Sequence, residues 1–161
     1  MADLARTARN ERLARRGSGR GPVREFLTFV LGADIFGVEL ARVKEILSPP
    51  PITHVPRAPS EVVGVCSVRG LLVTVVDLRV RLKLEVRPDT RRTRILLALA
   101  QSGEAVGLWV DEVLQVVRLA EADMELATAG VGTEVSEYVL GVGRPQGEFI
   151  VLLDLAALVT G

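Results

Sequence analysis

The sequence contains two related halves, and this duplication constrains the fold more than any other feature. Residues 26–31 are echoed by 95–100, and residues 37–40 by 107–110, with the second copy about 70 to 77 residues after the first. Each copy then carries a Gly-Val pair, a lone glycine and an Asp-Leu pair at identical spacing, beginning at Gly64, Gly70 and Asp77 and at Gly141, Gly147 and Asp154. Repetition of this kind predicts two related β-units, and differences between the copies are where function is sought.

Short apolar runs separated by turn residues predict an all-β protein with short helices. Strands are expected at 26–31, 35–40, 62–68, 71–76, 95–100, 105–110, 138–142 and 149–153, and helical turns at 41–47, 78–84 and 155–159. Asp77 and Asp154 are predicted to cap the helices that follow them. Two small units leave exposed sheet edges, which packing together or exchanging strands would hide. We therefore expect two pseudo-symmetric barrels.

The composition is that of a folded protein with no strong overall field. The 161 residues are 48% hydrophobic, and 20 basic side chains balance 20 acidic ones. Any partner surface must therefore be local. A single cysteine, Cys66, suits a reducing cytoplasm, and its apolar surroundings predict a buried, inert thiol. The sequence contains no run of the roughly twenty apolar residues that a transmembrane helix needs, so we expect a cytoplasmic protein without membrane insertion.

The N-terminal segment, residues 1–22, differs from the rest. It holds six arginines against two acids and ends in a Gly-Ser-Gly linker. This composition predicts a disordered tail of solvated charge. The alternative is a basic arm for anionic partners, including nucleic acid.

The sequence provides little for catalysis. The single histidine, His54, falls in a proline-rich arm, where we expect a surface loop, and Cys66 falls in an apolar strand twelve residues away. Trp109 and Phe36 fall in predicted strands and are expected in the core. No set of nucleophile, base and metal ligands is grouped, so the sequence predicts neither an enzyme nor a metal or cofactor site. The alternative hypothesis is an enzyme built on the same two barrels.

The two copies differ at two charged positions. Arg69-Gly70 aligns with Gln146-Gly147, and Glu45 aligns with Gln115. The hairpin therefore does not itself require the arginine. Arginine at a strand junction offers fixed donors to a protein partner, while an intramolecular salt bridge or a solvated tip explains it equally well.

Several motifs carry a resemblance to a known family. They are residues 25–29, 36–38, 43–46, 52–59, 64–70, 75–79, 106–111 and 152–155. In this order and spacing the chain resembles the CheW-like chemotaxis coupling proteins from Arg24 to Val159. The resemblance implies two five-stranded SH3-like barrels within 23–161, related by the internal duplication, with a linker near 85–94.

The resemblance also implies a non-catalytic adaptor in the cytoplasm, recruited to membrane-associated receptor arrays. Such an adaptor joins the cytoplasmic tip of a chemoreceptor to the regulatory domain of a chemotaxis histidine kinase. The family's receptor-facing residues correspond to Arg69, Glu45, Val43 and Gly64. No kinase-facing residue is identified.

The chain also departs from the family. Cys66, Ser67 and Val68 replace the family's usual residues before the Arg-Gly pair. Valine for leucine is expected to be tolerated, whereas serine for asparagine shortens a hydrogen-bonding side chain, which predicts a different receptor preference. A scaffold in a related pathway controlling motility, development or transcription is the alternative function.

Overall fold

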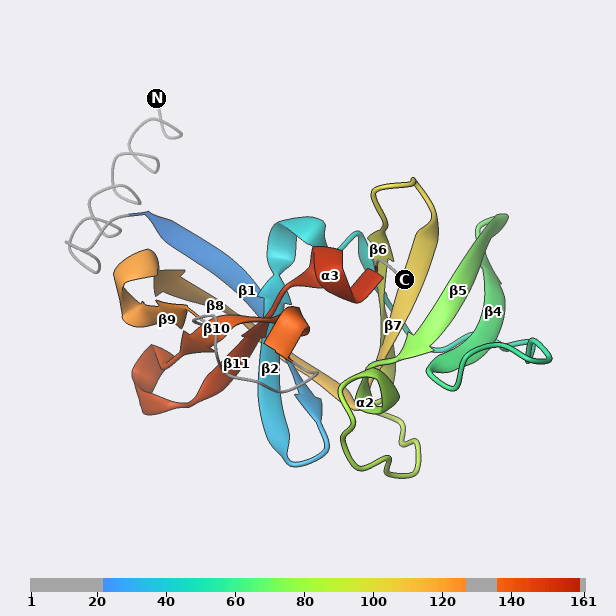
Figure 1. Cartoon of the computed structure of the whole chain (residues 1–161), viewed down its shortest axis with the longest axis horizontal. Coiled ribbons are helices and arrows are strands. Elements are labelled where there is room, and N and C mark those ends of the chain that lie inside the picture. The colour runs from blue at the N-terminus through green and yellow to red at the C-terminus, as the bar shows by residue number, and fades with distance from the viewer. Residues whose placement is uncertain (1–21, 127–135, 160–161) are drawn as a thin grey trace.

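The protein is described here from a computed structural model, which covers residues 22–126 and 136–159 (Figure 1). Its two sheets lie side by side. The first sheet has six strands in the order β8-β1-β2-β11-β10-β9. Their bounds are β1 Val23–Leu31, β2 Asp34–Glu39, β8 Glu112–Ala120, β9 Met124–Leu126, β10 Val139–Gly143 and β11 Ile150–Leu153.

The second sheet has five strands in the order β3-β6-β7-β5-β4. Their bounds are β3 Glu45–Leu47, β4 Val62–Val68, β5 Leu71–Asp77, β6 Arg94–Leu99 and β7 Ala105–Val110. Two short α-helices, α2 (Leu78–Arg81) and α3 (Leu155–Val159), follow β5 and β11. Four 3₁₀ turns complete the described part of the chain: η1 Leu40–Arg42, η2 Glu121–Asp123, η3 Ser136–Tyr138 and η4 Pro145–Gly147.

The two sequence copies exchange strands. In the six-stranded sheet, β2 of the first copy pairs in parallel with β11 of the second, with Gly37 opposite Leu152. In the five-stranded sheet, β5 of the first copy pairs in parallel with β7 of the second, with Gly107 opposite Val75. The register is the same in both, so each sheet combines the first hairpin of one copy with the last hairpin of the other. The copies hide their edges by this exchange.

The mainly β fold with two related sheets is confirmed, although the strands number six and five rather than five and five. The difference arises next to the last hairpin of each copy. Beside β10 the chain forms the strand β9, whereas beside β4 it forms only one isolated bridge, between Thr53 and Val65. The prolines on either side of Thr53, which lack an amide donor, keep that segment from pairing further.

Three apolar clusters form the core. The largest lies between the sheets and includes Phe29 and Val38 from the six-stranded sheet, Leu96 and Leu108 from the other, and Leu158 from α3. A second cluster, which contains Cys66 and Trp109, belongs to the five-stranded sheet, and a third belongs to the six-stranded sheet. The expected burial of Cys66, Phe36 and Trp109 is confirmed, and His54 is exposed as expected.

One expected helix is wrong. Residues 41–47 form the 3₁₀ turn η1 and then β3, so Glu45 lies on a strand. Apolar spacing over seven residues does not separate a helical turn from a strand. Pairing with β6 makes residues 45–47 a strand. In this position β3 covers the edge of β6, with Glu45 opposite Leu97 and Leu47 opposite Ile95.

Both predicted helix caps are confirmed. The Asp77 carboxylate accepts a hydrogen bond from the Arg79 amide at 2.9 Å, and the Asp154 carboxylate accepts one from the Ala156 amide at 3.1 Å. Residues 1–21 of the predicted tail lie outside the described residues. No helix in the described part of the chain is long and apolar enough to cross a membrane.

Candidate partner-binding site

Arg69 and Glu45 meet at the end of the five-stranded sheet. The Arg69 Nη1 donates to Glu45 Oε2 at 2.9 Å, and Nη2 donates to Oε1 at 2.7 Å. Arg69 follows β4 and Glu45 begins β3, and these strands are the two opposite edges of the sheet. The two charged positions that distinguish the copies are therefore partners, and their ion pair joins the sheet's edges.

This ion pair contributes little to stability. The Arg69 side chain is 79% exposed and that of Glu45 26% exposed. Exposed ion pairs are typically worth about 0–1 kcal/mol, because water and salt screen the charges. The two-pronged geometry does orient the guanidinium, and only two of its five N–H donors are used on Glu45. The side chain is therefore exposed to partners and fixed in direction.

The turn that carries Arg69 belongs to the scaffold. Arg69 and Gly70 have φ of 52° and 80°, and Gln146 and Gly147 of the second copy have φ of 55° and 83°. Paired left-handed residues of this kind suit a tight hairpin between twisted strands. Because the second copy adopts the same turn with glutamine, the fold fixes the position and leaves the side chain free to vary.

Gly64 is buried, and its role is also structural. A Cβ there would lie 2.2 Å from the carbonyl oxygen of Thr53. At the equivalent Gly141, a Cβ would lie 2.3 Å from the carbonyl oxygen of Glu125. Both glycines sit beside a break in the strand register. The close backbone approach that they allow holds a neighbouring segment against β4 and against β10.

Val43 lies at the junction of the two sheets. It is half-buried and packs against the apolar cluster between them. Its neighbours in the chain line a groove of about 200 Å³ between η1 and α3, which we call the junction groove. The groove is lined by Ala41, Arg42, Lys44, Leu99, Gln101, Leu155, Ala156 and Val159. Apolar and cationic side chains therefore meet there.

Exposed apolar side chains lie next to the two charged residues in the sequence or on the strand beside β3. Leu71 and Leu72, directly after the Arg69 turn, are 48% and 68% exposed. Ile46, next to Glu45, and Leu99, at the end of β6, are exposed as well. Exposed apolar residues around a fixed charge are typical of protein interfaces rather than of active sites.

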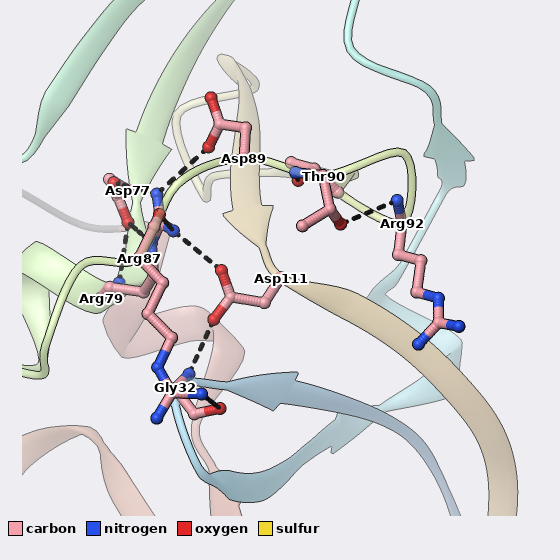
Figure 2. A network of polar contacts seen from close by, with 9 residues as sticks. Gly32, Asp77, Arg79, Arg87, Asp89, Thr90, Arg92 and Asp111 are labelled. Atoms are coloured by element: carbon pink, nitrogen blue, oxygen red, sulfur yellow. Dashed lines mark hydrogen bonds and ion pairs between the residues drawn. The ribbon is translucent and has the colours of Figure 1, made fainter.

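Among the described residues, sequence reasoning missed the buried side chain of Arg79, which has several polar partners (Figure 2). Its side chain is 3% exposed and forms a two-pronged ion pair with Asp77, at 3.0 Å from Nε and 2.9 Å from Nη2. Its Nη1 donates to Asp111 Oδ1 and to the Arg87 carbonyl, both at 2.8 Å. The hydrogen bond to Asp77 is the main reason that the pKa of Arg79 is raised. The sequence shows an Asp-Leu-Arg run at 77–79, but only the structure shows that Arg79 is buried.

Two other groups have shifted pKa values. Burial raises the pKa of the Cys66 thiol. Burial also raises the pKa of the Tyr138 phenol, helped by the negative charge of Glu137. Both shifts favour the neutral form, the opposite of an activated nucleophile. Within the described ranges, no group of three or more histidine, cysteine, aspartate or glutamate side chains could hold a metal ion.

Comparison with known proteins finds relatives over most of the chain. A family model described as a CheW-like domain matches residues 25–161. The chain is 31% identical to the chemotaxis protein CheW of Klebsiella aerogenes, over 84% of this chain and 81% of the relative. It is 36% identical to Protein FrzA of Myxococcus xanthus, over 85% and 86%.

The fold has a solved counterpart. A crystal structure of the scaffolding protein TtCheW from Thermoanaerobacter tengcongensis superposes with a TM-score of 0.76 at 25% identity, covering 82% of this chain and 89% of that one. Members of this family are non-catalytic scaffold or adaptor proteins, in agreement with the expectation that the chain is not an enzyme. From the matched span and the shared fold, we conclude that the chain belongs to the family of CheW-like domain proteins.

Proposed function

We propose that the protein couples chemoreceptors to a chemotaxis-type histidine kinase. The cytoplasmic tip of a receptor would bind one part of its surface and the regulatory domain of the kinase another. The protein would then act in the cytoplasm at membrane-associated receptor arrays, where its partners would recruit it. No small-molecule substrate or cofactor is part of this proposal.

The observation that carries the proposal is the Arg69–Glu45 pair. An exposed ion pair contributes little to stability, and the Arg69 side chain is 79% exposed. Its direction is fixed by two hydrogen bonds and by a rigid turn. A donor that is oriented before binding loses little conformational entropy when a partner arrives. These features support Arg69 and Glu45 as receptor contacts.

A helical receptor tip suits this surface. Apolar side chains of the helix would pack beside Val43 and into the junction groove, where Leu99 and Val159 offer an apolar lining. Arg42 and Lys44 would favour acidic residues on the same helix. Arg69 and Glu45 would fix the helix register through charged hydrogen bonds. Gly64 would contribute indirectly, by keeping the Thr53 segment against β4.

Reconstitution tests this proposal. Receptor-containing membranes, the kinase and this protein are mixed, and kinase autophosphorylation and co-sedimentation are measured with each component omitted in turn. The proposal predicts that the kinase sediments with receptor membranes and is stimulated only when this protein is present. Equal stimulation without the protein would refute it.

A second function is a scaffold in a related pathway controlling motility, development or transcription. One observation favours it: the relative with 36% identity is named Protein FrzA rather than a chemotaxis protein. Co-purification from the native cell separates the two, because the kinase and receptor recovered with the protein identify the pathway.

A further inference from the structure

The two ends of the junction between the sheets differ. Figure 1 shows α2 at one end of this junction and α3 at the other. The offset of 77 residues that relates Asp77 to Asp154 places Arg79 on Ala156. The offset of 70 residues that relates Gly37 to Gly107 places Asp111 on Ala41. Ala41 and Ala156 both line the junction groove. Where one end has a buried arginine and a carboxylate, the other end has two alanines and an opening.

The buried end joins the two sheets by polar contacts (Figure 2). Asp111 lies where the chain passes from β7 in one sheet to β8 in the other. Its Oδ1 accepts from Arg79 at 2.8 Å, and its Oδ2 accepts from the amide of Gly32, in the β1–β2 turn, at 2.7 Å. Its own amide donates to the Val30 carbonyl at 3.1 Å. We call Arg79, Asp111 and Gly32 the junction clamp.

Helix capping does not explain the arginine. Asp154 caps α3 in the second copy with an alanine at the position of Arg79. Stability does not explain it well either, because a buried ion pair often contributes no more than a well-packed apolar group of similar volume. A directional network does something that apolar packing does not: it selects one relative placement of the groups that it joins. The groups joined here belong to different sheets.

We propose that Arg79 is a positioning residue, which acts through Asp111 and Gly32 to set the angle between the two sheets and so the width of the junction groove. The groove lies at the other end of the same junction, so loosening the clamp lets the sheets rotate about the apolar cluster between them. The expected effect on receptor binding rests on the proposed function. The effect of Arg79 on the angle between the sheets does not.

The test uses Asp111→Asn in the full chain. Asparagine has one acceptor oxygen where aspartate has two. With that oxygen turned to the Arg79 guanidinium, the side-chain NH₂ faces the Gly32 amide and the hydrogen bond to the β1–β2 turn is lost, so the clamp opens. The Arg79–Asp77 pair remains. Asp89→Asn is the matched control: it also removes a carboxylate near Arg79, at 3.7 Å, but that carboxylate is 59% exposed and lies in the segment between α2 and β6.

The first readout needs no partner. Spin labels at Ser67 on β4 and Arg118 on β8, both exposed, report the distance between the sheets in a Cys66→Ala background. We expect Asp111→Asn to broaden the distance distribution at least twofold and to speed hydrogen exchange of the Gly32 amide at least tenfold. Asp89→Asn should change neither. An unchanged distribution in Asp111→Asn would overturn the proposal.

The second readout is affinity for a receptor cytoplasmic hairpin from the same organism. We expect a five- to tenfold loss in Asp111→Asn, without contact between residue 111 and the hairpin, and less than twofold in Asp89→Asn. If Asp111→Asn binds as tightly as the parent despite a broadened distribution, the link to the groove is wrong. If the parent itself does not bind while the distribution broadens, the proposed function fails and the clamp stands.

Discussion

Gly64 lies directly against the backbone of Thr53, so closely that a Cβ on the glycine would be 2.2 Å from the Thr53 carbonyl oxygen. The approach is needed because Thr53 and Val65 exchange two backbone hydrogen bonds, at 2.8 and 2.9 Å. Gly141 repeats the arrangement against Glu125. A glycine duplicated in sequence thus marks a contact duplicated in space.

We predict that Gly64→Ala lowers the free energy of unfolding by about 2–3 kcal/mol or more, because the added methyl group forces the backbone of the Thr53 segment away. The measurement is chemical denaturation followed by tryptophan fluorescence. Gly70→Ala is the control: its φ is also positive, 80° against 155° at Gly64, but an added Cβ meets nothing within 4 Å. It should cost about 1 kcal/mol. Equal losses in the two variants would contradict the steric account.

Arg79→Met is predicted to destabilise the protein by about 3–5 kcal/mol, because it leaves the buried Asp77 carboxylate without its cation. Asp77→Asn/Arg79→Met should lose clearly less than Arg79→Met alone, since asparagine still caps α2 and carries no charge. Equilibrium unfolding of both variants measures the difference. A double variant that is as unstable as the single one would show that packing, not charge, sets the cost.

The Cys66 thiol is predicted to be unreactive in the folded protein. Burial raises its pKa, so the folded state binds the thiol proton more tightly than the unfolded state does. Burial of the thiol therefore carries no ionisation penalty below the unfolded pKa, and the penalty grows as the pH rises from the unfolded pKa to the folded pKa. The decline in unfolding free energy over that alkaline range should be shallower in Cys66→Ala. A thiol reagent that reacts as fast with the native protein as in denaturant would refute this expectation.

The Arg69–Glu45 pair is predicted to matter little for stability. Because the arginine is 79% exposed, Arg69→Ala should change the free energy of unfolding by less than about 1 kcal/mol. Thermal unfolding at low and high salt measures this, and the difference between parent and variant should shrink with salt. A loss of several kcal/mol would mean that the pair holds the edges of the sheet together.

The scaffold was largely predictable from the sequence. The positions of eight strands, the Arg69-Gly70 turn and the caps at Asp77 and Asp154 follow from local rules that act on neighbouring residues, whereas the strands β8 and β9 were not predicted. Which strands exchange between copies did not follow, because pairing β2 with β11 depends on contacts more than a hundred residues apart. For the same reason the sequence alone predicts a helical turn over 41–47: only the edge of β6 makes residues 45–47 a strand.

The comparison of the two sequence copies predicted the candidate site only in part. It separated Arg69 and Glu45 from the scaffold, and the structure then brought them together. Arg79 also occurs in the first copy alone, yet it is buried and structural. A difference between copies therefore marks any place where the two environments differ, at the surface or at the junction. Only burial and hydrogen-bond partners separate the two cases.

The most direct test of the account is the affinity of Arg69→Ala for a receptor cytoplasmic hairpin, measured beside the charge-exchanged variant Glu45→Arg/Arg69→Glu. The exchanged variant can still form the ion pair within the protein but presents the charges in reverse. If the exposed pair is a receptor contact, both variants stay folded and both lose at least tenfold in affinity. Parent-like binding by Arg69→Ala, or restored binding in the exchanged variant, would show that Arg69 serves the protein's own structure and would contradict the assignment.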